Sequence, residues 1–210
     1  MKRITFLTAA FLCLSGLTES PAQDTQSNRN MEELKLTQEW DKTFPKSDKV
    51  NHSKVTFVNR YGITLAADLY VPKTTTGRKL PAIAVSGPFG AVKEQSSGLY
   101  AQTLAERGFL TIAFDPSFTG ESGGQPRYVA SPDINTEDFS AAVDYLATRP
   151  DVDAERIGIV GICGWGGFAI NAAANDTRIK ATVASTMYDI SRCSANGYFD
   201  ANDNADARYK

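Results

Sequence analysis

The sequence predicts an α/β fold, with a mostly parallel, doubly wound sheet that follows an antiparallel hairpin. From residue 80 onward, apolar strand-like segments alternate with helix-like segments, which is the pattern of successive βαβ units. Ahead of them, residues 54–71 alternate apolar and polar side chains, as a hairpin with one solvated face does. A chain of 210 residues with 42% hydrophobic residues can bury one core, so we expect a single globular domain.

Residues 1–22 have the pattern of a bacterial secretory signal peptide. Two basic residues precede an apolar run over residues 4–14, and small residues precede a cleavage site after Ala22. The apolar run is too short to span a bilayer. Cys13 would be the lipidated residue of a lipoprotein, but Leu12 occupies the preceding position, where such signals carry a small residue. We therefore expect a periplasmic or secreted protein.

The mature chain is expected to begin with a polar lead-in over residues 23–53, containing a short helix at residues 31–40. The folded domain then covers residues 54–210. Its hairpin is expected to pair a strand over residues 54–59 with a strand over residues 63–71 through a tight turn.

The later elements follow from their apolar patterns and their turn residues. The expected strands are residues 80–86, 110–115, 156–162 and 179–186, and the expected helices lie within residues 98–109, 134–153 and 166–175. Gly108 is placed to end the first helix, and Asn135 or Thr136 to cap the second. The continuous apolar strands at residues 80–86 and 110–115 predict a sheet that is covered on both faces.

Three glycine-rich loops follow strands of this sheet, at residues 87–94, 116–125 and 162–167. Because ligands bind at the carboxyl ends of strands in open α/β sheets, we expect these loops to share one crevice. The third loop passes from strand to helix within a few residues and carries Cys163 at its apex. A thiol at a helix N-terminus meets free N–H groups that stabilise negative charge on sulfur, so Cys163 is a candidate nucleophile.

The motif around this cysteine, GICGW, resembles the nucleophile elbow of the α/β-hydrolase superfamily in its cysteine form, as in dienelactone-hydrolase-like proteins of the bacterial esterase and peptidase branch. The resemblance covers residues 54–188 in register. It implies a sheet of the α/β-hydrolase type, Cys163 as nucleophile, and a small-molecule substrate with an ester, lactone or amide bond. It also implies an oxyanion hole formed by the N–H groups of Gly164 and Phe89, since Pro88 has no N–H.

The same resemblance predicts parts that this sequence does not supply. Such hydrolases carry an acid and a histidine after the nucleophile, whereas no histidine follows Cys163. Residues 198–210 show no strand pattern, so we expect a C-terminally truncated domain that lacks the last strands. The 210-residue chain would then be feeble as an enzyme, or an inert remnant or binding protein.

Four further residues are candidates for the cleft. Trp165 stands where the motif usually has a small residue, and is expected to be a cleft wall or core filler. Lys93 and Glu94 could be an active-site pair, with a solvated turn as the alternative. Arg127 is singled out by the resemblance, with a loop-tethering salt bridge as the alternative. His52 lies in a polar stretch and is expected at the surface.

Other interpretations of the cysteine loop remain. Cys163 could fill space in the core, or form a disulfide with Cys193, which an oxidising compartment permits. Gly164, Gly166 and Ala169 spell the G-x-G-x-x-A pattern of a dinucleotide site, with Asp189 as the ribose ligand. That unit should open its sheet, however, and here it comes late in the chain.

The charge composition bears on which kinds of partner the protein could bind. The formal net charge of −2 does not favour binding to nucleic acid or to an anionic membrane. The resemblance and the residue pattern call for no cofactor and no metal, and nothing in the sequence indicates an oligomeric state.

Overall fold

The computed structural model describes residues 33–74 and 77–202. The expected signal peptide, its cleavage site at Ala22 and Cys13 lie outside the described residues. The strands are β1 (Val50–Val58), β2 (Thr64–Pro72), β3 (Leu80–Ser86), β4 (Leu110–Phe114), β5 (Val152–Ile162) and β6 (Ile179–Ser185). The helices are α1 (Ser96–Ala105), α2 (Pro132–Ala147), α3 (Gly164–Asn175), α4 (Ile190–Asn196) and the short 3-10 helix η1 (Tyr198–Asp200).

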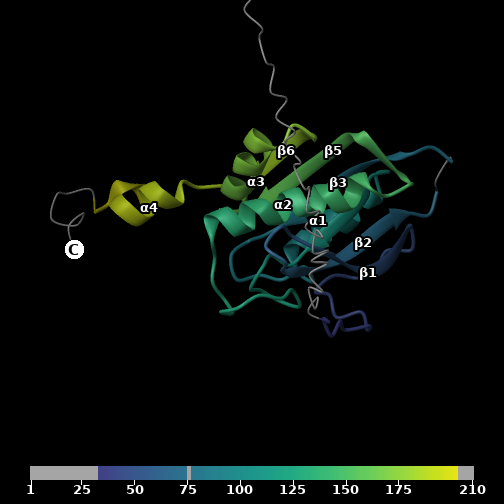
Figure 1. Cartoon of the computed structure of the whole chain (residues 1–210), viewed down its shortest axis with the longest axis horizontal. Helices are drawn as coiled ribbons and strands as arrows, with labels where there is room; N and C mark the ends of the chain where they lie inside the picture. The colour runs from purple at the N-terminus through teal and green to yellow at the C-terminus, as the bar shows by residue number, and fades with distance from the viewer. Residues whose placement is uncertain (1–32, 75–76, 203–210) are drawn as a thin grey trace, which may run out of the picture.

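The six strands form one sheet in the order β1-β2-β4-β3-β5-β6 (Figure 1). β1 pairs with β2 and β2 with β4 in antiparallel fashion, whereas the β3–β4, β3–β5 and β5–β6 pairs are parallel. This arrangement confirms the predicted fold class. It also brings the carboxyl ends of β3, β4 and β5 to one edge, where the three glycine-rich loops emerge.

Helices cover both faces of the sheet, as a doubly wound fold requires. Phe139 of α2 and Ala169 of α3 belong to one buried cluster with the strands. Ala101 and Ala105 of α1 belong to a second cluster that includes Val160. Within the described residues, no helix is long and apolar enough to cross a membrane.

The hairpin differs from the expectation of one solvated face. β1 alternates buried and exposed residues, but β2 is buried on both faces along almost all of its length. The reason is its position between β1 and β4, where residues preceding β1 cover the face that carries Asp68 and Tyr70.

The lead-in is packed against the domain, and residues 33–49 contain no helix, so the short helix expected there is wrong for its described part. Phe44 is buried, the Thr43 N–H donates to the Glu94 carbonyl at 3.0 Å, and Lys42 Nζ lies 2.9 Å from Asp68 Oδ2. β1 begins at Val50, ahead of the strand start expected at residue 54.

The cap of α2 also differs from the prediction. The helix begins at Pro132, and Ser131 Oγ accepts the Ile134 N–H. Asn135 is fully buried: its Oδ1 accepts the Ser131 N–H at 2.8 Å and its Nδ2 donates to Asp138 at 3.1 Å. The predicted caps, Asn135 and Thr136, are therefore wrong, because the helix starts one turn earlier with proline in its first position.

Candidate active site

Cys163 stands between β5 and α3 as the single residue that turns the chain from strand to helix. Its φ is 58° and its ψ −125°, a conformation that costs energy for any residue except glycine. Its N–H donates to the Ser185 carbonyl at 2.8 Å, and its carbonyl accepts the Gly166 N–H at 3.0 Å. The strained turn thus places the thiol at the N-terminus of α3.

Small residues let α3 cross close to β5 behind this turn. A Cβ on Gly161 would overlap the Trp165 carbonyl oxygen and lie 2.7 Å from the Ala169 Cβ. A Cβ on Gly166 would lie 2.9 Å from the Met187 Cβ. Packing therefore requires glycine at positions 161 and 166.

The loop after β3 lies directly against the cysteine turn. A Cβ on Gly87 would overlap the Ile162 carbonyl oxygen, and a Cβ on Gly164 would overlap the Phe89 ring. The structure thus brings together Phe89 and Gly164, the two predicted oxyanion donors. Among the described residues, neither of these two N–H groups donates a hydrogen bond. The Gly164 N–H has no acceptor within α3, because it belongs to the first turn of that helix. Their role as oxyanion donors stays a prediction.

Trp165 turns its ring into the core and so does not obstruct the turn. It is 2% exposed and packs edge-to-face on Phe89 at a centroid distance of 4.4 Å and on Phe168 at 5.2 Å. It is core filler, and it also lines a cavity of about 310 Å³ beside the cysteine turn. Trp165 is thus buried in the core and also lines this cavity, and a role in a substrate cleft stays a prediction.

Lys93 and Glu94 are not a solvated turn. Lys93 is 1% exposed, and its Nζ lies 2.8 Å from Asp115 Oδ2 and 2.7 Å from Glu121 Oε2. Glu94 Oε1 lies 2.7 Å from Lys93 Nζ and 3.2 Å from Lys54 Nζ. Burial on its own lowers the pKa of Lys93, but the carboxylates around it outweigh burial and raise the pKa above its usual range. These residues form a buried ion network beneath the loops that follow β3 and β4.

Arg127 tethers a loop, as its alternative interpretation predicted, but it does so through carbonyl groups. Its guanidinium donates to the Gly120 carbonyl at 2.6 Å and to the Ser122 carbonyl. The guanidinium carbon also lies 5.9 Å from the centre of the Tyr128 ring. Arg127 therefore fixes the rim of the cavity that Trp165 lines.

His52 is not a surface residue. Its Nε2 lies 2.8 Å from Asp68 Oδ1, in a cluster with Lys42 and the rings of Trp40 and Tyr70. Burial favours the neutral form of Asp68, but hydrogen bonds from His52 and Lys42 outweigh it and lower the pKa of this carboxyl. Three strands separate β1, which carries His52, from β5, roughly 19 Å at the usual strand spacing. The chain's one histidine is therefore remote from the thiol.

The disulfide and dinucleotide interpretations receive no support. Cys163 and Cys193 are both free. Asp189 Oδ1 accepts the Arg192 N–H at 2.9 Å and caps α4, so its carboxylate is already used. Among the described residues, no group of histidine, cysteine and acidic side chains could hold a metal ion.

Tyr188 is a neighbour of Cys163 that the sequence analysis did not single out. Burial raises the pKa of Tyr188, and the Cys163 thiol, with which Tyr188 forms a hydrogen bond, raises it further.

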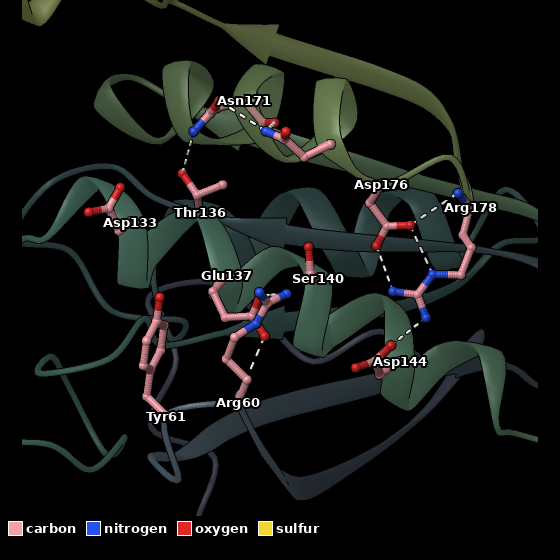
Figure 2. A pocket seen from close by; sticks show the side chains of 11 residues that line it. Arg60, Tyr61, Asp133, Thr136, Glu137, Ser140, Asp144, Asn171, Asp176 and Arg178 are labelled. Carbon is pink, nitrogen blue, oxygen red and sulfur yellow. Dashed lines mark hydrogen bonds and ion pairs between the residues drawn. The ribbon is translucent and has the colours of Figure 1, made fainter.

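A larger polar groove of about 580 Å³ lies elsewhere, between α2, α3 and the turn after β1 (Figure 2). Most of its charged side chains are paired with one another: Arg60 lies 2.7 Å from Glu137, and Arg178 contacts both Asp144 and Asp176. The α3 residues that line it belong to the C-terminal half of the helix, away from Cys163. We therefore place the candidate site at the cysteine turn.

Comparison with known proteins gives one family and several relatives. The family model for X-Pro dipeptidyl-peptidase (S15 family) matches residues 61–208. The uncharacterised protein PA2218 of Pseudomonas aeruginosa is 68% identical over 198 residues, which is 93% of this chain and 53% of that protein. Its crystal structure matches with a TM-score of 0.81 at 69% identity, covering 84% of this chain and 55% of that one.

Two more distant matches are described as a thiohydrolase and as an α/β hydrolase. Thiohydrolase aneE of Aspergillus aculeatus is 32% identical over 138 residues, 66% of this chain and 42% of that protein. The crystal structure of the α/β hydrolase GrgF from a Penicillium species matches with a TM-score of 0.58 at 28% identity, covering 63% of this chain and 44% of that one. The fold is that of an α/β-hydrolase. The chain spans about half the length of the curated relatives it matches.

Proposed function

This chain belongs to the X-Pro dipeptidyl-peptidase (S15) family, and from that premise we propose that it is part of a hydrolase of ester-, thioester- or amide-type bonds in which Cys163 is the nucleophile. One observation carries the proposal: a cysteine in a strained conformation at the head of α3, with the Phe89 loop packed against the next residue. Strained residues of this kind gather at functional sites. The thiohydrolase among the relatives supports the inclusion of thioesters.

In the proposed first step, the Cys163 thiolate attacks the carbonyl carbon of the substrate. A C–S bond forms, and the carbonyl electron pair moves to oxygen, where the N–H groups of Gly164 and Phe89 donate hydrogen bonds. Collapse of this intermediate expels the alcohol, thiol or amine with the bonding electrons, and the leaving group takes a proton from solvent. Cys163 then carries the acyl group as a thioester.

The second step is the attack of water on that thioester, which releases the carboxylic acid and restores the thiol. It needs a base to accept the proton of water. His52 cannot serve, because it is bound to Asp68 near the opposite edge of the sheet. We therefore propose that the 210-residue chain acylates once and releases the acyl group slowly.

The test is a stopped-flow measurement with p-nitrophenyl acetate, followed by mass spectrometry. We expect a burst of about one p-nitrophenolate per chain and one acetyl group on Cys163, lost in Cys163→Ala and kept in Cys193→Ala. Brisk sustained turnover that survives Cys163→Ala would overturn the proposal. A folded chain that never acquires the acetyl group would favour the second candidate, an inert hydrolase-fold or binding protein, which the position of His52 supports.

We also propose export to the periplasm or beyond, with cleavage after Ala22. The support is the basic, apolar and small-residue pattern of residues 1–22. N-terminal sequencing of protein from the periplasmic fraction should read from Gln23, and an intact Met1 on exported protein would contradict the proposal.

A further inference from the structure

Beside the cysteine turn lies a cavity of about 310 Å³ with a largely apolar wall. Phe89 and Val92 come from the loop after β3, Tyr128 and Val129 from the segment that leads into α2, and Trp165 from the first turn of α3. None of the side chains that line it is charged; Thr119 and Tyr128 carry hydroxyls, and the buried Trp165 Nε1–H has no hydrogen-bond partner among the described residues. An occupant that fits this wall is therefore uncharged and apolar.

The cavity is next to the proposed nucleophile. The Phe89 ring lies against Gly164, the residue after Cys163, and packs edge-to-face on Trp165 at 4.4 Å. Cys163 itself does not line the cavity, so Phe89 and Trp165 are the residues that connect the cavity to the nucleophile.

The rim of the cavity holds exposed aromatic and aliphatic surface in a fixed position. Tyr128 is 86% exposed, and Phe89 and Val129 are each 39% exposed. Tyr128 has a φ of 60°, and its N–H donates to the Phe118 carbonyl at 2.9 Å. Arg127 lies over the Tyr128 ring while it is bound to the Gly120 and Ser122 carbonyls. Large apolar side chains held at the mouth of a cavity are typical of a ligand site.

We propose that this cavity binds the acyl group of the substrate, and that the acyl group is uncharged and either aryl or branched alkyl. A protein cavity of about 150 Å³ can hold benzene, so the volume here accommodates a ring with a short linker, such as phenylacetyl. Tyr128 and Phe89 contact the ring, and Arg127 positions Tyr128. This inference rests on the proposed function, since it takes Cys163 as the point of attachment.

The first arm of the test measures binding without chemistry. In the Cys163→Ala variant, a trifluoromethyl-labelled phenylacetamide is titrated by ¹⁹F NMR. We expect saturable binding that Ala130→Trp, a substitution at an exposed wall position, weakens about tenfold or more by filling the cavity. A carboxylate-substituted phenylacetamide should bind more weakly, because none of the side chains that line the cavity is charged. Equal binding of both compounds, or no effect of Ala130→Trp in a folded variant, would overturn the proposal.

The second arm measures selectivity in the chain with Cys163 intact. The ratio of the acylation rates with p-nitrophenyl phenylacetate and p-nitrophenyl acetate should fall about tenfold in Tyr128→Ala, because an aromatic contact with the ring is lost. Tyr61→Ala is the matched control: this exposed tyrosine lies on the polar groove, and its loss should leave the ratio unchanged. An unchanged ratio in Tyr128→Ala would contradict the proposal.

The two arms separate this inference from the proposed function. Binding that responds to Ala130→Trp, in a chain whose Cys163 never acquires an acyl group, would refute the nucleophile and keep the cavity. Acylation that ignores every cavity variant would keep the nucleophile and refute the cavity.

Discussion

Lys93 Nζ lies 2.8 Å from Asp115 Oδ2, and both side chains are wholly buried. Lys93 belongs to the loop after β3 and Asp115 follows β4, so the pair joins two of the three loops that meet at the candidate site. Glu121 extends the connection, because its carboxylate also contacts Lys54 and accepts the Thr37 N–H at 2.6 Å. Ion pairs therefore anchor both the loops and the N-terminal segment.

We predict that Lys93→Met destabilises the fold by about 3–5 kcal/mol, because it leaves the Asp115 charge buried without its partner. Arg156→Met is the control. Arg156 and Asp153 form an exposed pair at 2.6 Å, and such pairs contribute about 1 kcal/mol or less. Urea unfolding of both variants measures the difference, and equal losses would show that the network contributes no more than a surface pair.

Stability should also fall steeply in acid because of Glu121. Burial favours its protonated form, but hydrogen bonds from Lys54 and Lys93 outweigh burial and lower the pKa of Glu121 from 4.5 to about 2. A pKa that is lower in the folded state stabilises the fold above the unfolded value, and this contribution is lost as the pH falls from 4.5 through about 2. Unfolding measured across this window should show a shallower decline in Glu121→Gln, and an identical decline would refute the assignment.

The sheet and the cysteine turn could be predicted from the sequence because both depend on the order of residues that are close together in the chain. Continuous apolar runs mark β3, β4 and β5, and a glycine cluster between a strand and a helix marks the turn at Cys163. The close packing of α3 on β5 at that turn depends on the same glycine cluster. Each of these features depends on side chains close together in the chain.

The burial of charged residues could not be predicted in this way. Lys93 pairs with Asp115, which lies 22 residues later in the chain, and Lys42 pairs with Asp68, which lies in a different element. Neither pairing produces a periodic pattern of residues in the sequence. The position of Asp68 inside an apolar strand was the available clue, since a charge in such a strand needs a buried partner. His52 was misplaced for the same reason, because its partner is Asp68.

Two glycines should respond in opposite ways to alanine. A Cβ on Gly161 would overlap the Trp165 carbonyl, so Gly161→Ala should cost about 1–3 kcal/mol by pushing α3 away from β5. Gly167 lies in α3 with nothing within 4 Å of an added Cβ, so Gly167→Ala should stabilise by about 0.5–1 kcal/mol through helix propensity. Thermal unfolding decides the matter, and the same sign for both would contradict this account.

The two free cysteines should differ in reactivity. At neutral pH we expect iodoacetamide to alkylate Cys163 faster than Cys193, because the N-terminus of α3 stabilises negative charge at Cys163, whereas Cys193 lies within α4. Single-cysteine variants, Cys163→Ser and Cys193→Ser, assign the rates by mass spectrometry. Equal, slow labelling of both under native conditions would favour the view that Cys163 only fills space.

Within the described residues, β6 is the last strand of the sheet and has a free edge. α1 packs on β2, β3 and β4 on one face, and a groove of about 450 Å³ stays open over β3, β5 and β6 on the described surface. Val183 of β6 lines it and is 54% exposed. An edge strand beside exposed apolar surface is a template for pairing with another chain.

We therefore expect the 210-residue chain to self-associate, and Val183→Lys to reduce this association by placing a charge on the edge strand. Tyr61→Lys is the matched control, because Tyr61 is 52% exposed in the turn after β1, the strand at the opposite edge of the sheet. Sedimentation velocity over a range of concentrations should show a smaller mean mass for Val183→Lys than for the unchanged chain or the control. If the chain without substitutions is monodisperse and unfolds cooperatively at high temperature, the free edge of β6 does not cause self-association and the prediction is wrong.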